Sequence, residues 1–148
     1  MSSHQFLYLS SDDSMDYFPD NSPINFRVKM PNPRLFQCMW LCGVISFQYY
    51  DLFSIDTMSS NSPLNFYICS DLCQQSYVND STEPVLSRCF IKPINDGLLH
   101  EVQISNPIYV PIVQYFKDYI HIYIKGDKGA HISLDKGPSK VTLHLKRI

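Results

Sequence analysis

The feature that most constrains the fold is a period-two alternation of apolar and polar residues in short runs. Between Ile24 and Met30, the apolar residues Phe26 and Val28 alternate with polar neighbours, and Met30 continues the same series. In an extended chain, every second side chain lies on the same face, whereas a helix would scatter these positions around its axis. The pattern therefore predicts a half-buried β-strand, and its recurrence along the chain predicts an all-β protein.

Clusters of Pro, Asn, Asp, Ser and Gly close most of these runs and predict turns or loops. We expect exposed loops over Asp51 to Pro63 and Gln74 to Glu83, a helical turn within Val110 to Lys117, and a tight turn over Gly126 to Gly129. The predicted strands are Phe6 to Leu9, Ile24 to Met30, Met39 to Tyr49, Leu64 to Ser70, Val85 to Lys92, Leu98 to Ile104, Tyr119 to Lys125 and Lys140 to Ile148.

Asn95-Asp96-Gly97 is a strong hairpin signal, so we expect the strand that follows it to pair with the strand that precedes it. In the third predicted strand, Leu41, Gly43, Ile45 and Phe47 should share one face. Gly43 predicts either a β-bulge or a close approach of another segment to the backbone.

The apolar faces of the predicted strands need partners, and the simplest solution is two facing antiparallel sheets. About eight antiparallel strands of this length and spacing are typical of a single jelly-roll β-sandwich. With 148 residues, of which 45% are hydrophobic, the chain suits one compact domain over residues 1–148.

The net charge and the N-terminal sequence limit the classes of function that we expect for this chain. The formal net charge is −2 and no basic run occurs, so we expect no specific nucleic-acid partner. The N-terminal residues lack the basic and apolar regions of a signal peptide, and no apolar stretch is long enough to span a membrane. We therefore expect a soluble protein made inside the cell.

The five cysteines are an odd number and do not predict a disulfide scaffold. Cys38 and Cys42, like Cys69 and Cys73, are separated by three residues. On a strand this spacing puts the thiols roughly 13 Å apart, which is too far for one tetrahedral zinc ion. We favour buried free thiols and expect no metal.

The remaining polar residues do not form an enzyme motif. His4, His100, His121, His131 and His144 lie near no recognisable nucleophile signature, so surface positions are favoured. Four carboxylates near the N-terminus lack the spacing of a calcium loop and favour a solvated loop instead. We expect no enzymatic activity and no cofactor. The four carboxylates belong to Asp12, Asp13, Asp16 and Asp20.

Aromatic residues are unusually frequent, with ten Tyr and nine Phe. Several fall in predicted loops or on the outward side of predicted strands, and exposed aromatics in such number indicate burial against partner chains. They are Tyr49, Tyr50, Phe53, Tyr109, Tyr115, Tyr119 and Tyr123.

A series of blocks along nearly the whole chain resembles one known family. The blocks run from an aromatic-Pro-Asp-Asn turn near the N-terminus to a basic final strand. The C-terminal half is the more specific part, with the Tyr-Val-Pro-Ile block at residues 109–112 and the final strand. The blocks are Ser14 to Phe26, Trp40 to Tyr49, Asn65 to Asp71, Pro84 to Arg88, Asn106 to Ile112, Ile120 to Ile124 and Lys140 to Arg147. In this order they resemble the penton-type minor capsid protein of Polinton/Maverick elements and adintoviruses.

The resemblance implies a single jelly roll that forms homopentamers at the five-fold vertices of a virion, beside a double jelly-roll major capsid protein. Five-fold closure needs a heterologous interface, and such interfaces favour aromatic residues and Arg. We expect Arg88, Tyr109 and Tyr115 to lie at the subunit interface. The family carries an acidic, Gly-containing stretch where this chain has Leu72 to Asp80, so that loop should contact its neighbours differently.

Two alternatives remain open. One is a jelly-roll binding module that recognises carbohydrate or a cell-surface partner. The other is a cupin-like metalloenzyme, which would need His and carboxylate ligands clustered inside the sandwich, and the scattered histidines argue against it.

Overall fold

The computed structural model describes residues 3–55, 62–113 and 117–148, and its regular secondary structure is almost entirely β-strand. Two short 3-10 turns lie within these ranges, η1 (Leu35–Gln37) and η3 (Asp127–Gly129). The strands are β1 (His4–Ser10), β2 (Asn25–Lys29), β3 (Trp40–Tyr49), β4 (Phe53–Ser54), β5 (Leu64–Ser70), β6 (Ser76–Val78), β7 (Ser81–Glu83), β8 (Val85–Ile91), β9 (His100–Gln103), β10 (Val110–Pro111), β11 (Tyr119–Gly126), β12 (Ile132–Ser133) and β13 (Lys140–Arg147).

Two antiparallel sheets form the body of the molecule. One has the order β1-β13-β3-β10, with β9 also pairing with β3, and the other has the order β2-β11-β5-β8. The eight main strands pair from the outside inwards along the chain, as β1 with β13, β2 with β11, β3 with β9 and β5 with β8. A long antiparallel hairpin rolled up in this way is a jelly roll.

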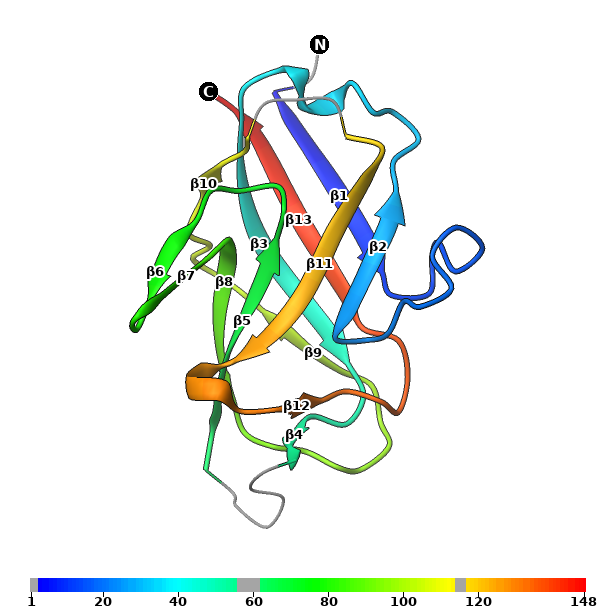
Figure 1. The fold of residues 1–148 in the computed structure, drawn as a ribbon, viewed down its shortest axis with the longest axis vertical. Coiled ribbons are helices and arrows are strands. Elements are labelled where there is room, and N and C mark those ends of the chain that lie inside the picture. The colour runs from blue at the N-terminus through cyan, green and yellow to red at the C-terminus, as the bar shows by residue number, and fades with distance from the viewer. Residues whose placement is uncertain (1–2, 56–61, 114–116) are drawn as a thin grey trace.

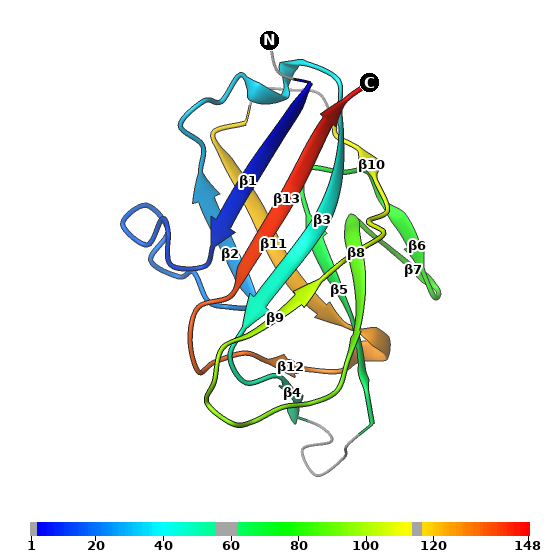
Figure 2. The same ribbon diagram turned by 180° about the vertical axis from the view of Figure 1, so that it is seen from behind.

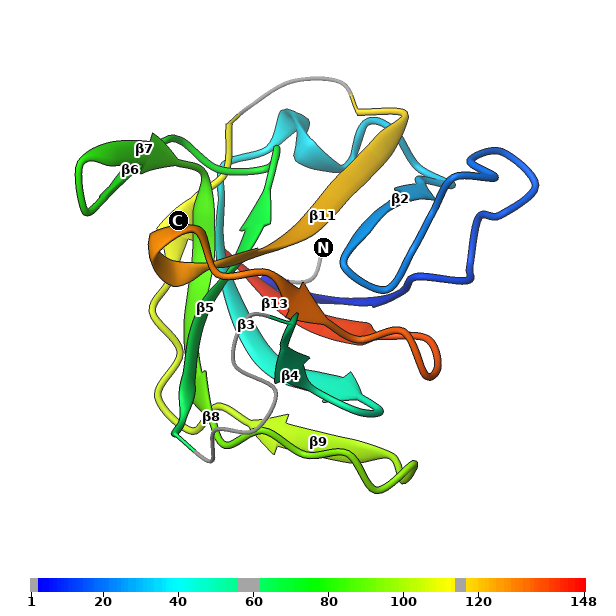
Figure 3. The same ribbon diagram turned by 60° about the horizontal axis from the view of Figure 1, so that its bottom comes forward.

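The two sheets face each other as the layers of a sandwich. In Figure 1, β2, β11, β5 and β8 form the front layer, and Figure 2 shows β1, β13, β3 and β9 from behind. The loop between β1 and β2 projects from one side of the sandwich, and the β6–β7 hairpin projects from the opposite side (Figures 1 and 3). This arrangement confirms the predicted all-β jelly-roll sandwich.

The core fills the space between the sheets with side chains that alternate along each strand. Val141, Leu143 and Leu145 of β13 are fully buried, as are Ile120 and Ile122 of β11. Full burial of one such side chain stabilises the fold by about 1.5–3 kcal/mol relative to exposure. Both strands therefore show the period-two burial that is typical of half-buried strands.

Strand β3 departs from simple alternation. Thr142 pairs with Ser46 and Leu143 pairs with Val44, so Ile45 is an extra residue opposite β13. Such a β-bulge shifts the side-chain phase, and Phe47 consequently lies in the core together with Val44. The prediction that Phe47 shares a face with Leu41 and Ile45 was therefore wrong.

Gly43 marks the close approach of another segment rather than the bulge itself. A Cβ atom at this position would lie 3.0 Å from the Tyr109 ring and 3.1 Å from Cβ of Pro107. Of the two predictions for Gly43, the close approach of another segment to the backbone is therefore confirmed.

The predicted hairpin across Asn95-Asp96-Gly97 was wrong, because β8 and β9 belong to different sheets. The turn itself is present, and Gly97 has a positive φ of 73°. Its N–H donates to the buried carboxylate of Asp51 at 2.8 Å, so the turn is tied to the loop after β3 while the chain crosses between sheets.

Three further expectations need correction. The predicted loop over Gln74 to Glu83 contains the β6–β7 hairpin. Val110–Pro111, at the start of the predicted helical turn, is the strand β10, and residues 114–116 of that turn lie outside the described residues. Asp51 and Leu52, which we expected in an exposed loop, are buried, and so is Tyr49 at 4% exposure. Within the described ranges, no helix has the length and apolar character needed to cross a membrane.

Candidate functional site

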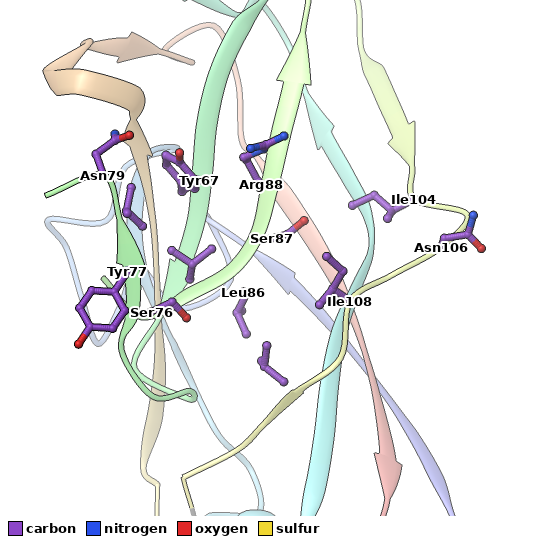
Figure 4. Close-up of a pocket in the computed structure, with 13 residues that line it drawn as sticks. Tyr67, Ser76, Tyr77, Asn79, Leu86, Ser87, Arg88, Ile104, Asn106 and Ile108 are labelled. Atoms are coloured by element: carbon purple, nitrogen blue, oxygen red, sulfur yellow. The ribbon is translucent and has the colours of Figure 1, made fainter. Parts of the chain in front are cut away.

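A groove of about 670 Å³ lies beside the edge strand β8 (Figure 4). Its floor comes from β5 and β8, one wall comes from the β6–β7 hairpin, and the other wall comes from the segment that leads from β9 to β10. The lining residues are Tyr67, Ser76, Tyr77, Val78, Asn79, Val85, Leu86, Ser87, Arg88, Ile104, Asn106, Ile108 and Val110.

The floor of the groove follows from the register of β5 and β8. Phe66 and Ile68 point into the core, so Tyr67 between them points outward, and Tyr67 is the cross-strand partner of Arg88. Neighbouring positions of the same strands thus supply the sandwich core and the outer surface. The groove lies directly over a rigid sheet.

Polar contacts hold the β6–β7 hairpin beside this floor. Asp127, in the turn after β11, accepts hydrogen bonds from Asn79 at 2.8 Å, Asn65 at 3.1 Å and Tyr67 at 3.3 Å. These hydrogen bonds, with Asn79 contributing most, lower the pKa of the Asp127 carboxyl below its usual value. One carboxylate therefore joins the hairpin tip, the groove floor and the turn after β11.

The other end of the hairpin is held by a second carboxylate. Glu83 accepts a hydrogen bond from Tyr123 at 3.0 Å and forms an ion pair with Lys125. The hydrogen bond from Lys125 lowers the pKa of Glu83. Because the hairpin is fixed at both ends, the groove keeps its wall without a bound partner.

The opposite wall results from a change of partner on the free edge of β3. Strand β9 pairs with the end of β3 and β10 pairs with its beginning, so the intervening residues leave the sheet near the bulge. Ile104 still donates its N–H to the carbonyl of Ile45 at 2.9 Å. Beyond it, Ile108 is 80% exposed and turns its side chain toward the groove (Figure 4).

Arg88 is the only charged side chain among the residues that line the groove. It is exposed, and no carboxylate in the described part of the chain forms an ion pair with it. Across the groove, Tyr77 is 91% exposed. An exposed guanidinium without an ion-pair partner among the described residues, beside exposed apolar side chains, is a composition that suits contact with a negatively charged group.

Tyr109 belongs to a different surface, the outer face of the other sheet. Its ring covers Gly43, its hydroxyl forms a 2.7 Å hydrogen bond with His144 Nδ1, and Nζ of Lys146 lies 3.8 Å from the ring centroid. His4 completes this cluster, with its Nδ1 2.9 Å from Nε2 of His144. Burial, together with the positive charges that His4 and Lys146 can carry, lowers the pKa of His144.

The cysteine thiols and the possible metal ligands do not form a further site among the described residues. All five thiols are free, and Cys42, Cys69, Cys73 and Cys89 are buried, where burial raises the pKa of Cys69 and Cys89 to about 12. Among the described residues, no group of three or more His, Cys, Asp or Glu side chains could hold a metal ion.

Arg88 and Tyr109, the two predicted interface residues that the structure describes, lie on different surfaces. Arg88 lines the groove and Tyr109 lies in the cluster around His144, while Tyr115 falls outside the described residues. Sequence reasoning missed Tyr77 and Ile108, which lie on two chain segments brought together by the fold. Tyr77 could have been noticed as the one aromatic residue in a polar run that ends in Asn79-Asp80.

Comparison of the sequence with known protein-family models found no match, and comparison with curated proteins found none either.

Proposed function

We propose that the chain is a structural capsid protein, the subunit of a homopentamer that occupies the five-fold vertices of an icosahedral double-stranded DNA virus or virus-like mobile element. Its partners are four identical subunits and a double jelly-roll major capsid protein. In this proposal it is made as a soluble protein inside the host cell, acts in the virion, and works by assembly, without catalysis or a cofactor.

The observation that carries the proposal is the exposure of large apolar side chains on opposite sides of a jelly roll. Tyr77 and Ile108 are 91% and 80% exposed beside β8, and Tyr17 is 64% exposed in the loop between β1 and β2. Exposed apolar surface of this kind is typical of sites that become buried against other chains. A ring subunit needs two such surfaces, because each subunit meets a different face of each neighbour.

Two further observations support the same function. The jelly roll is a common fold of viral capsid proteins, although lectins and cupins share it. The ordered blocks from Ser14 to Arg147 resemble penton-type capsid proteins, and this family supplies the five-fold ring and the major capsid partner.

The test is the mass of the purified chain in solution, followed by co-expression with a double jelly-roll major capsid protein. We expect a particle of five times the 17.2 kDa of one chain, and rings with five-fold symmetry in negative-stain images. A chain that stays monomeric at high concentration and does not join capsid vertices would overturn the proposal. In that case, a jelly-roll module that binds carbohydrate or a cell-surface partner is the next function to test.

A further inference from the structure

We propose that the groove beside β8 binds the loop between β1 and β2 of a second copy of this chain. The inference rests on the proposed function and names the two surfaces that meet around the ring. The carboxylates of the loop would face Arg88, and Tyr17 would pack between the apolar walls of the groove.

The groove side needs an acidic partner with apolar contact groups. Arg88 is its one charged side chain and has no carboxylate partner among the described residues. A guanidinium desolvated by a partner needs a carboxylate opposite it, because an unpaired buried charge is strongly unfavourable. Ile108 on one wall is mostly exposed and turned toward the groove, so it needs an aromatic or aliphatic contact, and Tyr77, also mostly exposed, lies on the hairpin that forms the other wall with its ring pointing outward (Figure 4).

The loop between β1 and β2 carries both acidic and apolar side chains. Residues 11–24 contain four Asp and no Lys or Arg. Asp12 and Asp13 accept hydrogen bonds from Ser10, while Asp16 and Asp20 are exposed. Met15 and Tyr17 beside them are 41% and 64% exposed, so the same loop also carries apolar surface. The charges of groove and loop are therefore opposite, and both combine charge with apolar contact area.

The loop is also held in one conformation before it meets a partner. Asn21 exchanges two hydrogen bonds of 2.8 Å with the backbone of Arg27, and the Ser14 hydroxyl accepts the N–H of Lys29 at 2.9 Å. Both contacts tie the loop to β2. A loop that is already ordered loses less conformational entropy on binding than a loose one.

The position of the two surfaces allows a ring. The loop and the β6–β7 hairpin project from opposite sides of the sandwich (Figures 1 and 3). A loop on one side cannot reach the groove of its own chain on the other, so the contact must be made between chains. A contact between two different surfaces of identical subunits repeats head to tail and closes into a ring when the rotation permits.

The test compares self-association of the full chain with that of two charge-reversed variants, by sedimentation velocity over a range of concentrations. R88E reverses the groove, and D16K/D20K reverses the loop. Each variant should associate at least about tenfold more weakly than the unchanged chain, because like charges then face each other. K92E makes the same charge change at an exposed position of the neighbouring segment outside the groove, and should associate as the unchanged chain does.

Mixing the two reversed variants provides the decisive measurement. The R88E groove is complementary to the D16K/D20K loop, and the unchanged surfaces are also complementary, so the mixture should associate more strongly than either variant alone. It should form open alternating chains or rings with an even number of subunits, because a five-membered ring of two alternating variants keeps one mismatched contact. Thermal melting of each variant checks that it is folded.

Each remaining outcome decides against the inference. Rings that survive R88E, or a mixture that does not associate, overturn it and leave the pentamer proposal intact. If R88E rings form normally but no longer attach to the major capsid protein, the groove binds that protein instead, and the inference is again overturned. An unchanged chain that stays monomeric overturns the inference, and it overturns the capsid proposal as well if the chain also does not join capsid vertices.

Discussion

The outer faces of the two sheets differ in how far their side chains are satisfied within the chain. On the sheet of β1, β13 and β3, Tyr109 covers Gly43 and bonds His144, which also contacts His4. On the other sheet, Arg88 lines a groove without an ion-pair partner among the described residues. The first face contributes to the stability of the single chain, whereas the second keeps an exposed charged side chain that has no ion-pair partner among the described residues.

The largest effect on stability should come from filling the space that Tyr109 occupies. In Gly43→Val, the added side chain would meet the Tyr109 ring, since even a Cβ atom would lie 3.0 Å from it. We expect the free energy of unfolding to fall by about 2 kcal/mol, measured by chemical denaturation. In a Tyr109→Ala background the same substitution should cost much less, and equal costs in both backgrounds would show that the ring is not the cause.

A smaller loss should follow from removing the carboxylate that holds the hairpin wall. Asp127→Ala deletes the acceptor of three hydrogen bonds, including that of the Asn65 amide. We expect a loss of about 1–2 kcal/mol and faster amide hydrogen exchange over β6 and β7. Exchange rates that stay unchanged there would mean that the hairpin is held by other contacts, with the Glu83 pair as the next to test.

Lowering the pH should reduce the free energy of unfolding through His144, which lies on the outer face of the sheet of β1, β13 and β3. The pKa of His144 is lowered from the ordinary value of 6.5, so below that pH the unfolded chain binds more protons than the folded chain. The stabilising effect of the neutral imidazole is complete above pH 6.5 and is lost as the pH falls through the lowered pKa.

Melting temperatures measured between pH 7.5 and pH 5 should therefore fall, and fall less in His144→Gln. His121 also has a lowered pKa, caused first by burial and then by Arg27, so part of the decline should persist in this variant. A decline of the same size in both proteins would exclude His144 as a source.

The smallest effect on stability is expected from a substitution of Arg88 in the groove beside β8. Arg88→Ala removes an exposed side chain with no ion-pair partner in the described ranges, so the free energy of unfolding should change by less than about 0.5 kcal/mol. Self-association should nevertheless weaken clearly. A large loss of stability with unchanged self-association would show instead that Arg88 stabilises the single chain and does not take part in contacts between chains.

The sequence pattern predicts the strands well where the signal is local. The alternation of Val141, Leu143 and Leu145 identifies the buried face of β13 because period two is a property of one strand. The bulge at Ile45 could not be predicted, since it depends on how Thr142 and Leu143 of another strand align with β3. The turn at Gly97 was predicted, but its partner Asp51 lies 46 residues away, and hence the pairing of the next strand was missed.

The candidate site was predictable only in part. Arg88 was chosen as an interface residue, yet nothing in its neighbourhood along the chain shows that it lies in a groove. The walls come from residues 76–79 and 104–110, and Asp127 holds one wall through contacts with residues 48 to 62 positions away. Such a surface is a product of topology, which single-strand periodicity does not contain.

The exchange of partners on the edge of β3 has a consequence for protein engineering. Between Ile104, which still bonds the carbonyl of Ile45, and β10, the chain runs outside the sheet hydrogen bonding. Segments of this kind accept inserted residues at little cost to the folded core. A short peptide grafted between Ser105 and Pro107 would thus be displayed beside the groove, so this position suits the display of an epitope on the folded chain.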